Sequence, residues 1–108
     1  MLSASRHALA LGGVAAAPCS GFHHAKYSGA EGFCTFNGLM VTACVLQAHG
    51  QAKHVGILDF DQHWGNGTDD IIVQVGANWV RHYSAGAHWD SPSDAPRFLA
   101  AVPKLVEA

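Results

Sequence analysis

The stretch Val55-Gly56-Ile57-Leu58-Asp59-Phe60 is a nearly continuous apolar run near the middle of the chain. Such a run is typical of a strand in a parallel sheet that is buried on both faces. Over residues 36–49 apolar side chains recur at three- and four-residue steps, which predicts an amphipathic helix stopped by Gly50. Helix, buried strand and glycine-rich turn in this order predict an α/β fold, with three α/β/α layers around a mainly parallel sheet.

Further elements are expected on either side of this centre. A short helix is predicted to start at Thr68, whose hydroxyl could cap it, and a second strand is predicted over residues 78–82. A last helix is predicted to open at Ser93. Residues 3–11 are typical of a helix stopped by a glycine pair and followed by a strand over residues 14–18, although a signal peptide is the alternative interpretation of this region.

The composition is that of one small globular domain. The 108 residues carry a net charge of −2 and are 49% hydrophobic, which argues against a disordered tail and against a basic surface for nucleic acid. No apolar run approaches the roughly 18 residues that span a bilayer. Cys19, Cys34 and Cys44 form no C-x-x-C pair, and such scattered thiols suit a reducing compartment. We therefore expect a cytoplasmic protein without nucleic-acid or membrane partners.

Asp59, Asp61 and His63 alternate with other residues where the central strand is predicted to end. Side chains two residues apart point the same way in extended chain, so Asp61 and His63 can converge on one metal ion. Carboxylate and imidazole donors suit zinc, whose catalytic sites use three protein ligands and one open position. The alternative is a polar turn with a surface imidazole. The Gly65-Asn66-Gly67 turn that follows lets backbone approach the site closely.

A second candidate group lies in residues 18–34, a Gly- and Ser-rich stretch that predicts a long loop. Long loops within compact domains are usually functional or disordered, and the aromatic and histidine content here favours function. The adjacent His23 and His24 could act as a general acid/base with an electrostatic partner. A surface pair, or half of an opportunistic metal site, is the alternative. Phe22 and Phe33 could wall an apolar channel or simply pack in the core.

Three motifs occur in order: Gly21-Phe22-His23-His24-Ala25-Lys26, Gly32-Phe33-Cys34-Thr35-Phe36-Asn37, and Leu58-Asp59-Phe60-Asp61-Gln62-His63-Trp64-Gly65-Asn66-Gly67-Thr68. Together they resemble the histone deacetylase family, which includes bacterial acetylpolyamine amidohydrolases and has the arginase/deacetylase fold. The similarity is clearest over residues 13–86. The resemblance implies that residues 1–108 are an incomplete catalytic domain, the N-terminal to middle part of a zinc-dependent amidohydrolase that removes acetyl groups from lysine or a polyamine.

The resemblance also implies roles for single residues. Asp61 and His63 would be two of three zinc ligands, His24 would be the general base that activates the zinc-bound water, and His23 would be its electrostatic neighbour. This assignment coheres chemically, because zinc polarises the amide carbonyl while an imidazole passes a proton to the leaving amine.

The remaining implied roles surround that centre. Asp59 would hydrogen-bond His23 and join a structural potassium site, Asn66 would orient His24, and Phe33 would line the tunnel for the acetylated amine. Val80 stands where the family is expected to place a serine whose hydroxyl helps to bind potassium, so the resemblance leaves that cation in doubt.

Two parts of the family's machinery have no counterpart in this sequence, the third zinc ligand and the tyrosine that stabilises the oxyanion. We therefore expect the isolated chain to show little or no deacetylase activity. The alternative to an enzyme is a truncated remnant that self-associates and binds metal weakly. Half of a large sheet leaves an open hydrophobic edge, so self-association as a dimer or larger assembly is expected in either case.

Overall fold

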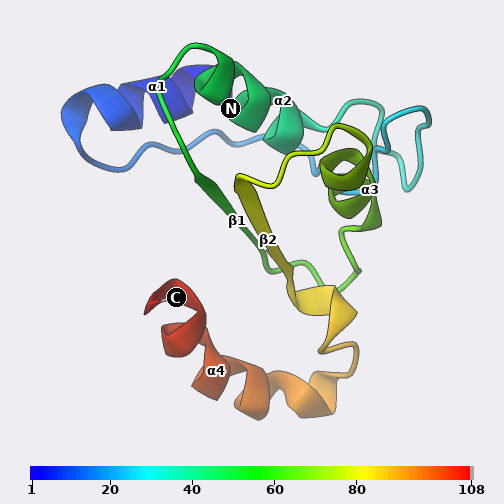
Figure 1. The fold of residues 1–108 in the computed structure, drawn as a ribbon. Coiled ribbons are helices and arrows are strands. Elements are labelled where there is room, and N and C mark those ends of the chain that lie inside the picture. The colour runs from blue at the N-terminus through cyan, green and yellow to red at the C-terminus, as the bar shows by residue number, and fades with distance from the viewer. Residues whose placement is uncertain (108) are drawn as a thin grey trace.

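The computed structural model describes residues 1–107. In chain order the elements are α1 (Leu2–Leu11), α2 (Gly38–Ala48), β1 (Val55–Asp59), α3 (Asn66–Gln74), β2 (Val80–Ser84), the 3₁₀ turns η1 (Ala85–Ala87) and η2 (Pro92–Asp94), and α4 (Ala95–Glu107) (Figure 1). None of these helices is long and apolar enough to cross a membrane.

The two strands pair in parallel, as the sequence predicts, and α3 provides the crossover between them. Their register places Val55 opposite Val80 at one end and Asp59 opposite Ser84 at the other. The carboxyl ends of both strands therefore meet at one edge of the sheet, which is where ligand sites form in open α/β folds.

One face of the sheet carries the hydrophobic core. Ile57 and Val80 pack there with Met40 and Ala43 of α2 and with Ala77, and all five side chains are buried. The helix α1 lies against α2 and extends this layer (Figure 1). The arrangement is an incomplete α/β fold, with helices above a small parallel sheet.

The other face of the sheet is open, so the prediction that residues 55–60 are buried on both faces is wrong. Burial alternates along β1, and the side chain of Leu58 is 47% exposed. The helix α4 lies on this side, but a cavity of about 790 Å³ separates the sheet from Leu105 and Val106. Phe98 near the start of α4 contacts Phe60, with the ring centroids 5.5 Å apart.

The predicted helices are confirmed, with their ends corrected. The first ends at Gly12, which takes a left-handed conformation, but residues 14–18 form no strand, and Val14 is almost fully exposed. Small alanine side chains give this segment little to bury. The second helix starts after Phe36 because the Asn37 side chain accepts a hydrogen bond from the Met40 N–H at 3.1 Å and so caps it.

Thr68 and the second strand are placed differently from the prediction. Thr68 does not cap α3, which begins after Gly65; it lies fully buried inside the first turn. Its hydroxyl accepts a hydrogen bond from Asn37 Nδ2 at 2.9 Å, which ties α3 to the start of α2.

The strand expected over residues 78–82 starts at Val80, because the chain is still turning after α3. This shift of two residues brings Ser84 into the strand.

Candidate active site

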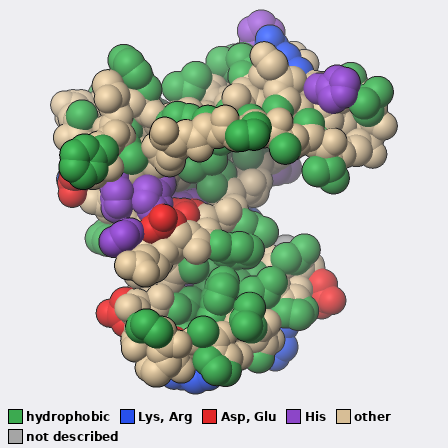
Figure 2. Space-filling view, turned by 180° about the vertical axis from the view of Figure 1, so that it is seen from behind, with side chains coloured by type: hydrophobic (Ala, Val, Ile, Leu, Met, Phe, Trp, Pro, Cys, Tyr) green, Lys and Arg blue, Asp and Glu red, His purple; other side chains and the backbone are tan. Residues whose placement is uncertain are grey.

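The polar site forms where β1 and β2 end, between the loop that carries the two histidines and the first turn of α3. Asp59 is the last residue of β1, and Asp61 and His63 follow it in the turn. Histidine and acidic side chains gather on one side of the molecule, between the upper helical part and the lobe at the bottom (Figure 2). The fold thus brings the two groups of residues predicted from the sequence to one place.

His23 is paired with Asp59. The His23 Nδ1 to Asp59 Oδ2 distance is 2.6 Å, and both side chains are about nine-tenths buried. Because a carboxylate can only accept, Nδ1 carries the proton and donates it to Asp59, in a short charge-assisted hydrogen bond. This bond fixes the orientation of the ring, and its other nitrogen, Nε2, lies 3.9 Å from Asp61 Oδ1.

His24 is paired with a neutral partner, the Asn66 amide, at 2.7 Å between Nδ1 and Oδ1. The amide orientation is set by Glu31, whose Oε1 accepts from Asn66 Nδ2 at 3.4 Å. Lys26 in turn forms an ion pair with Glu31, and the hydrogen bond from its ammonium group lowers the pKa of the Glu31 carboxyl. Glu31 therefore stays ionised and holds the Asn66 oxygen toward His24, whose Nδ1 must donate.

Asp61 and His63 face each other in the turn after β1. Asp61 Oδ1 accepts from the His63 backbone N–H at 2.7 Å and lies 2.8 Å from His63 Nδ1. The pKa of Asp61 is lowered, chiefly by that backbone N–H. Both side chains are at least half exposed, and the ring centroids of His24 and His63 are 6.0 Å apart.

The donor set does not by itself fit a zinc site. Asp61 and His63 are suitable donor types, but within residues 1–107 no three His, Cys, Asp or Glu side chains are grouped so that they could hold a metal ion. A catalytic zinc needs three protein ligands. A third ligand would have to come from outside this part of the chain.

Ser84 is a site residue that the sequence reasoning missed. Its Oγ accepts from the Gly65 N–H at 2.8 Å and lies 3.5 Å from Asp59 Oδ2. Val80, placed by the sequence comparison at the position of a cation-binding serine, pairs with Val55 at the opposite end of the sheet. Val80 therefore does not lie at the polar edge, and the serine hydroxyl beside Asp59 is that of Ser84. Extending the predicted second strand by two residues would have placed Ser84 next to Asp59.

His82 was also missed, because the middle of a predicted strand gives no signal for a site. Its side chain is 2% exposed, and its Nδ1 lies 2.7 Å from Asp69 Oδ1. The other nitrogen, Nε2, lies 4.0 Å from Asp59 Oδ2 and has no hydrogen-bond partner. Two histidines on different elements therefore approach one carboxylate.

The close approach of α3 to the histidine loop depends on Gly67. A Cβ atom there would lie 2.4 Å from the backbone carbon of His24 and 2.5 Å from the Ala25 oxygen. The Thr68 N–H donates to the His23 oxygen at 3.1 Å across the same contact. The predicted role of the glycine turn, to let backbone come close to the site, is what the structure shows.

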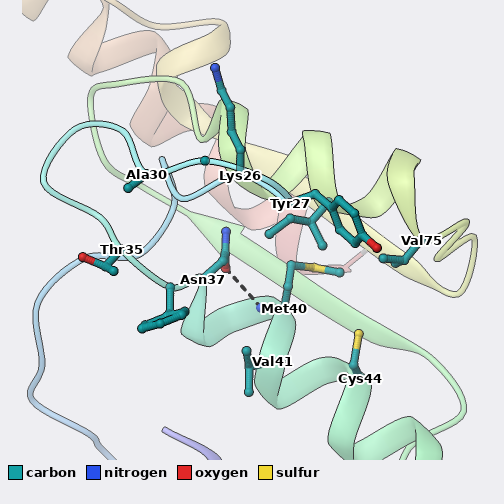
Figure 3. Close-up of a pocket in the computed structure, with 12 residues that line it drawn as sticks. Lys26, Tyr27, Ala30, Thr35, Asn37, Met40, Val41, Cys44 and Val75 are labelled. Carbon is teal, nitrogen blue, oxygen red and sulfur yellow. Dashed lines mark hydrogen bonds between the residues drawn. The ribbon is translucent and has the colours of Figure 1, made fainter.

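Phe33, the residue predicted to line a tunnel, lies in the loop between the two histidines and α2. It is fully exposed and has a positive φ of 60° in the short turn closed by Glu31 and Cys34. A separate apolar groove of about 490 Å³ lies between α2, α3 and residues 26–36, lined by Tyr27, Met40 and Val41 among others (Figure 3). None of the predicted site residues lines that groove.

Known proteins match this chain both in sequence and in structure. Residues 2–85 match the sequence model of the histone deacetylase domain. Histone deacetylase 6 of Caenorhabditis elegans is 48% identical over 52 residues, which are 48% of this chain and 5% of that protein. Histone deacetylase 15 of Arabidopsis thaliana is 52% identical over 52 residues, which are 48% of this chain and 9% of that protein.

A solved structure agrees with the sequence matches. The crystal structure of the HDA15 HD domain aligns with a TM-score of 0.55 and 44% identity, over 61% of this chain and 18% of that chain. This chain therefore spans a small part of the proteins it resembles, and the part it spans contains the polar edge of the sheet.

Proposed function

This chain belongs to the histone deacetylase domain family, and we propose on that premise that it carries the proton-transfer part of an active site that hydrolyses the acetyl amide of lysine or a polyamine. The observation that carries the proposal is the pair of oriented histidines. His23 is held by Asp59 and His24 by Asn66, side by side, with ring centroids 4.1 Å apart.

His24 is the proposed general base. Its Nδ1–H donates to Asn66, so the lone pair of the neutral ring is on Nε2, which can accept a proton from water. The same nitrogen can return that proton to the leaving amine. A positioned acid/base of this kind contributes about 10²–10⁴-fold to a rate.

His23 is the proposed electrostatic neighbour of His24. It is buried and held on Asp59, so it keeps a fixed ring orientation beside the base while His24 exchanges protons. Asp61 and His63 are proposed as two zinc ligands, consistent with their donor types and with the family, and a complete zinc site would require a third. Potassium is proposed beside Asp59, where the Ser84 hydroxyl supplies a further oxygen.

The isolated chain is proposed to have little or no deacetylase activity. It spans between 5% and 9% of the two relatives described above, and the family's third ligand and oxyanion tyrosine are missing from its sequence. Losing an oxyanion donor alone costs on the order of 100-fold in rate. An assay of the purified chain on an acetyl-lysine peptide with added zinc should give background turnover; turnover abolished by His24→Ala would contradict this.

A transplant tests whether the site residues themselves are competent. Residues 21–85 would replace the matching segment of the HDA15 HD domain, with which this chain shares 44% identity. We expect the chimera to hydrolyse an acetyl-lysine peptide, and His24→Ala in the chimera to reduce kcat by about 10²–10⁴-fold. A folded, zinc-loaded chimera without activity would refute the proposed competence of the site.

A second candidate function, a self-associating remnant, is favoured by the sheet. Its two strands pair only with each other within residues 1–107. The side chains of Leu58 in β1 and of Phe60 just after it are about half exposed. Two strands are seldom stable alone, and a second copy could extend the sheet. Light scattering at high concentration should give at least a dimer mass; a monomer mass would contradict self-association.

A further inference from the structure

We propose that His82 is a positioning residue for the His23–Asp59 pair, a role that neither the family's motifs nor the predicted site assigns to it. The observation behind this is a buried nitrogen without a partner. His82 Nε2 is aimed at Asp59 and stops 4.0 Å from Oδ2, while the side chain is 98% removed from solvent.

The His82 ring cannot rotate to give Nε2 a hydrogen-bond partner, because Nδ1 is already held by a hydrogen bond. Nδ1 lies 2.7 Å from Asp69 Oδ1, and a carboxylate accepts only, so Nδ1–H donates to Asp69. Asp69 is held on its other oxygen by the Trp64 indole N–H at 2.7 Å. The Trp64–Asp69–His82 chain therefore connects α3 to the middle of β2 and presents Nε2 to the polar edge.

The backbone of Gly65 lies close to both the Asp59 carboxylate and the His82 ring. A Cβ atom on Gly65 would lie 2.5 Å from Asp59 Oδ2 and 3.1 Å from the Cε1 atom of His82. The Gly65 N–H is used by Ser84, so it offers nothing to either side chain. Asp59 is thus bounded by His23 on one side and by the His82 ring and Gly65 on the other.

This enclosure restricts the movement of the carboxylate. Asp59 Oδ2 accepts from His23, and its other neighbours are the Ser84 hydroxyl, the His82 ring and a glycine with no side chain to shift. An apolar residue in the middle of β2 would leave no unpartnered nitrogen, and it would suit the position, because Ile57 of β1, opposite His82, and Val80 at the start of β2 are core residues. Leaving a buried polar atom unpaired is costly, which is why such atoms in native folds often mark a functional constraint.

The test compares stability with the His23 signal in the isolated chain, so it does not depend on catalytic activity. His82→Phe keeps an aromatic ring and removes both nitrogens, and Asp69→Leu removes the acceptor that fixes His82 Nδ1. His7→Phe, on the exposed side of α1, is the matched control. The readout is the low-field NMR signal of the His23 Nδ1–H, which the short bond to Asp59 protects from exchange with water.

We expect the His23 signal to be broadened or lost in folded His82→Phe. The melting temperature of that variant reflects two opposing changes, because the unpaired nitrogen and the hydrogen bond to Asp69 are lost together. Asp69→Leu should broaden the same signal to a smaller extent, and His7→Phe should leave it unchanged. A structural role alone would spare the signal, whatever the melting temperature. An unchanged signal in folded His82→Phe would overturn the proposal; if that variant does not fold, an unchanged signal in Asp69→Leu overturns it.

Discussion

The two acid–histidine pairs of the site are built in opposite ways. The His23–Asp59 pair joins a loop to a strand 36 residues later and is about nine-tenths buried. The Asp61–His63 pair is formed within one turn and is at least half exposed. The first pair is held by the tertiary fold, and the second is held by local chain geometry.

This difference shows which half of the proposed chemistry the chain completes. The buried histidines have partners, and those partners have further partners such as Glu31 and Ser84. The side chains of the exposed pair bond each other, and their nearest further polar contact is His23 Nε2, 3.9 Å from Asp61 Oδ1. Contacts within residues 1–107 therefore orient both rings of the proposed acid/base pair, whereas no third ligand-type side chain is grouped with Asp61 and His63 there.

Removing the buried carboxylate should have the largest effect. Asp59→Ala leaves a buried histidine unpaired and removes the acceptor of the Asp61 N–H, so we expect a loss of about 3 kcal/mol in the free energy of unfolding. Urea denaturation followed by tryptophan fluorescence measures it. Asp61→Ala is the matched control and should cost at most about 1 kcal/mol, because that carboxylate is exposed. Equal losses would show that the two pairs do not differ.

Crowding the contact between α3 and the histidine loop should have the next largest effect. Gly67→Ala places a methyl group against the backbone of His24 and Ala25, which cannot move aside as a flexible side chain could. We expect a loss of about 1–3 kcal/mol, measured by urea denaturation. Gly56→Ala is the control, because a Cβ there would meet nothing within 4 Å. Similar stabilities of the two variants would refute the close approach.

The sequence predicts features formed within a short segment, such as the Asp61–His63 turn, better than contacts formed by the tertiary fold. The alternation of Asp59, Asp61 and His63 and the periodicity of residues 36–49 are visible in the chain itself. The periodicity appears in the structure as the shorter helix α2, and the alternation appears as a turn that brings Asp61 and His63 together. Contacts such as Ser84 to Asp59 depend on strand register, and an error of two residues at the start of β2 hides them.

Burial is the other property that local pattern leaves open. Leu58 looks like a core residue in an apolar run, yet it faces a cavity because α4 does not reach the sheet. His82 looks like an ordinary strand residue, yet it is nearly inaccessible because Asp69 of α3 folds over it. Both depend on which helix covers which face, and no periodicity within the strand encodes that.

Removing the Asn66 amide, the neutral hydrogen-bond partner of His24, should lower the stability moderately. Asn66→Leu keeps the approximate volume and removes the acceptor for His24 Nδ1, so we expect a loss of about 1 kcal/mol in the free energy of unfolding. Asn66→Asp retains an acceptor for His24 but sets a second carboxylate against Glu31, so the control is Asn66→Asp combined with Glu31→Gln, measured by the same urea denaturation. Unchanged stability in Asn66→Leu would mean that the amide does not hold the ring.

The smallest effect is expected from acid titration of the exposed pair. The pKa of Asp61 is lowered below its ordinary value of 3.8 by the His63 N–H, so the folded state binds this proton less tightly than the unfolded state. The resulting stabilisation is present above about pH 3.8 and is lost as the pH falls through the lowered pKa. Asp61→Asn should therefore flatten the fall in unfolding free energy below pH 4 only slightly, because exposure to water weakens the interaction. A steep fall that disappears in Asp61→Asn would contradict the small effect expected of an exposed carboxylate; the matching measurement on Asp94→Asn, an acid outside the site, separates this from a general loss of carboxylate charge.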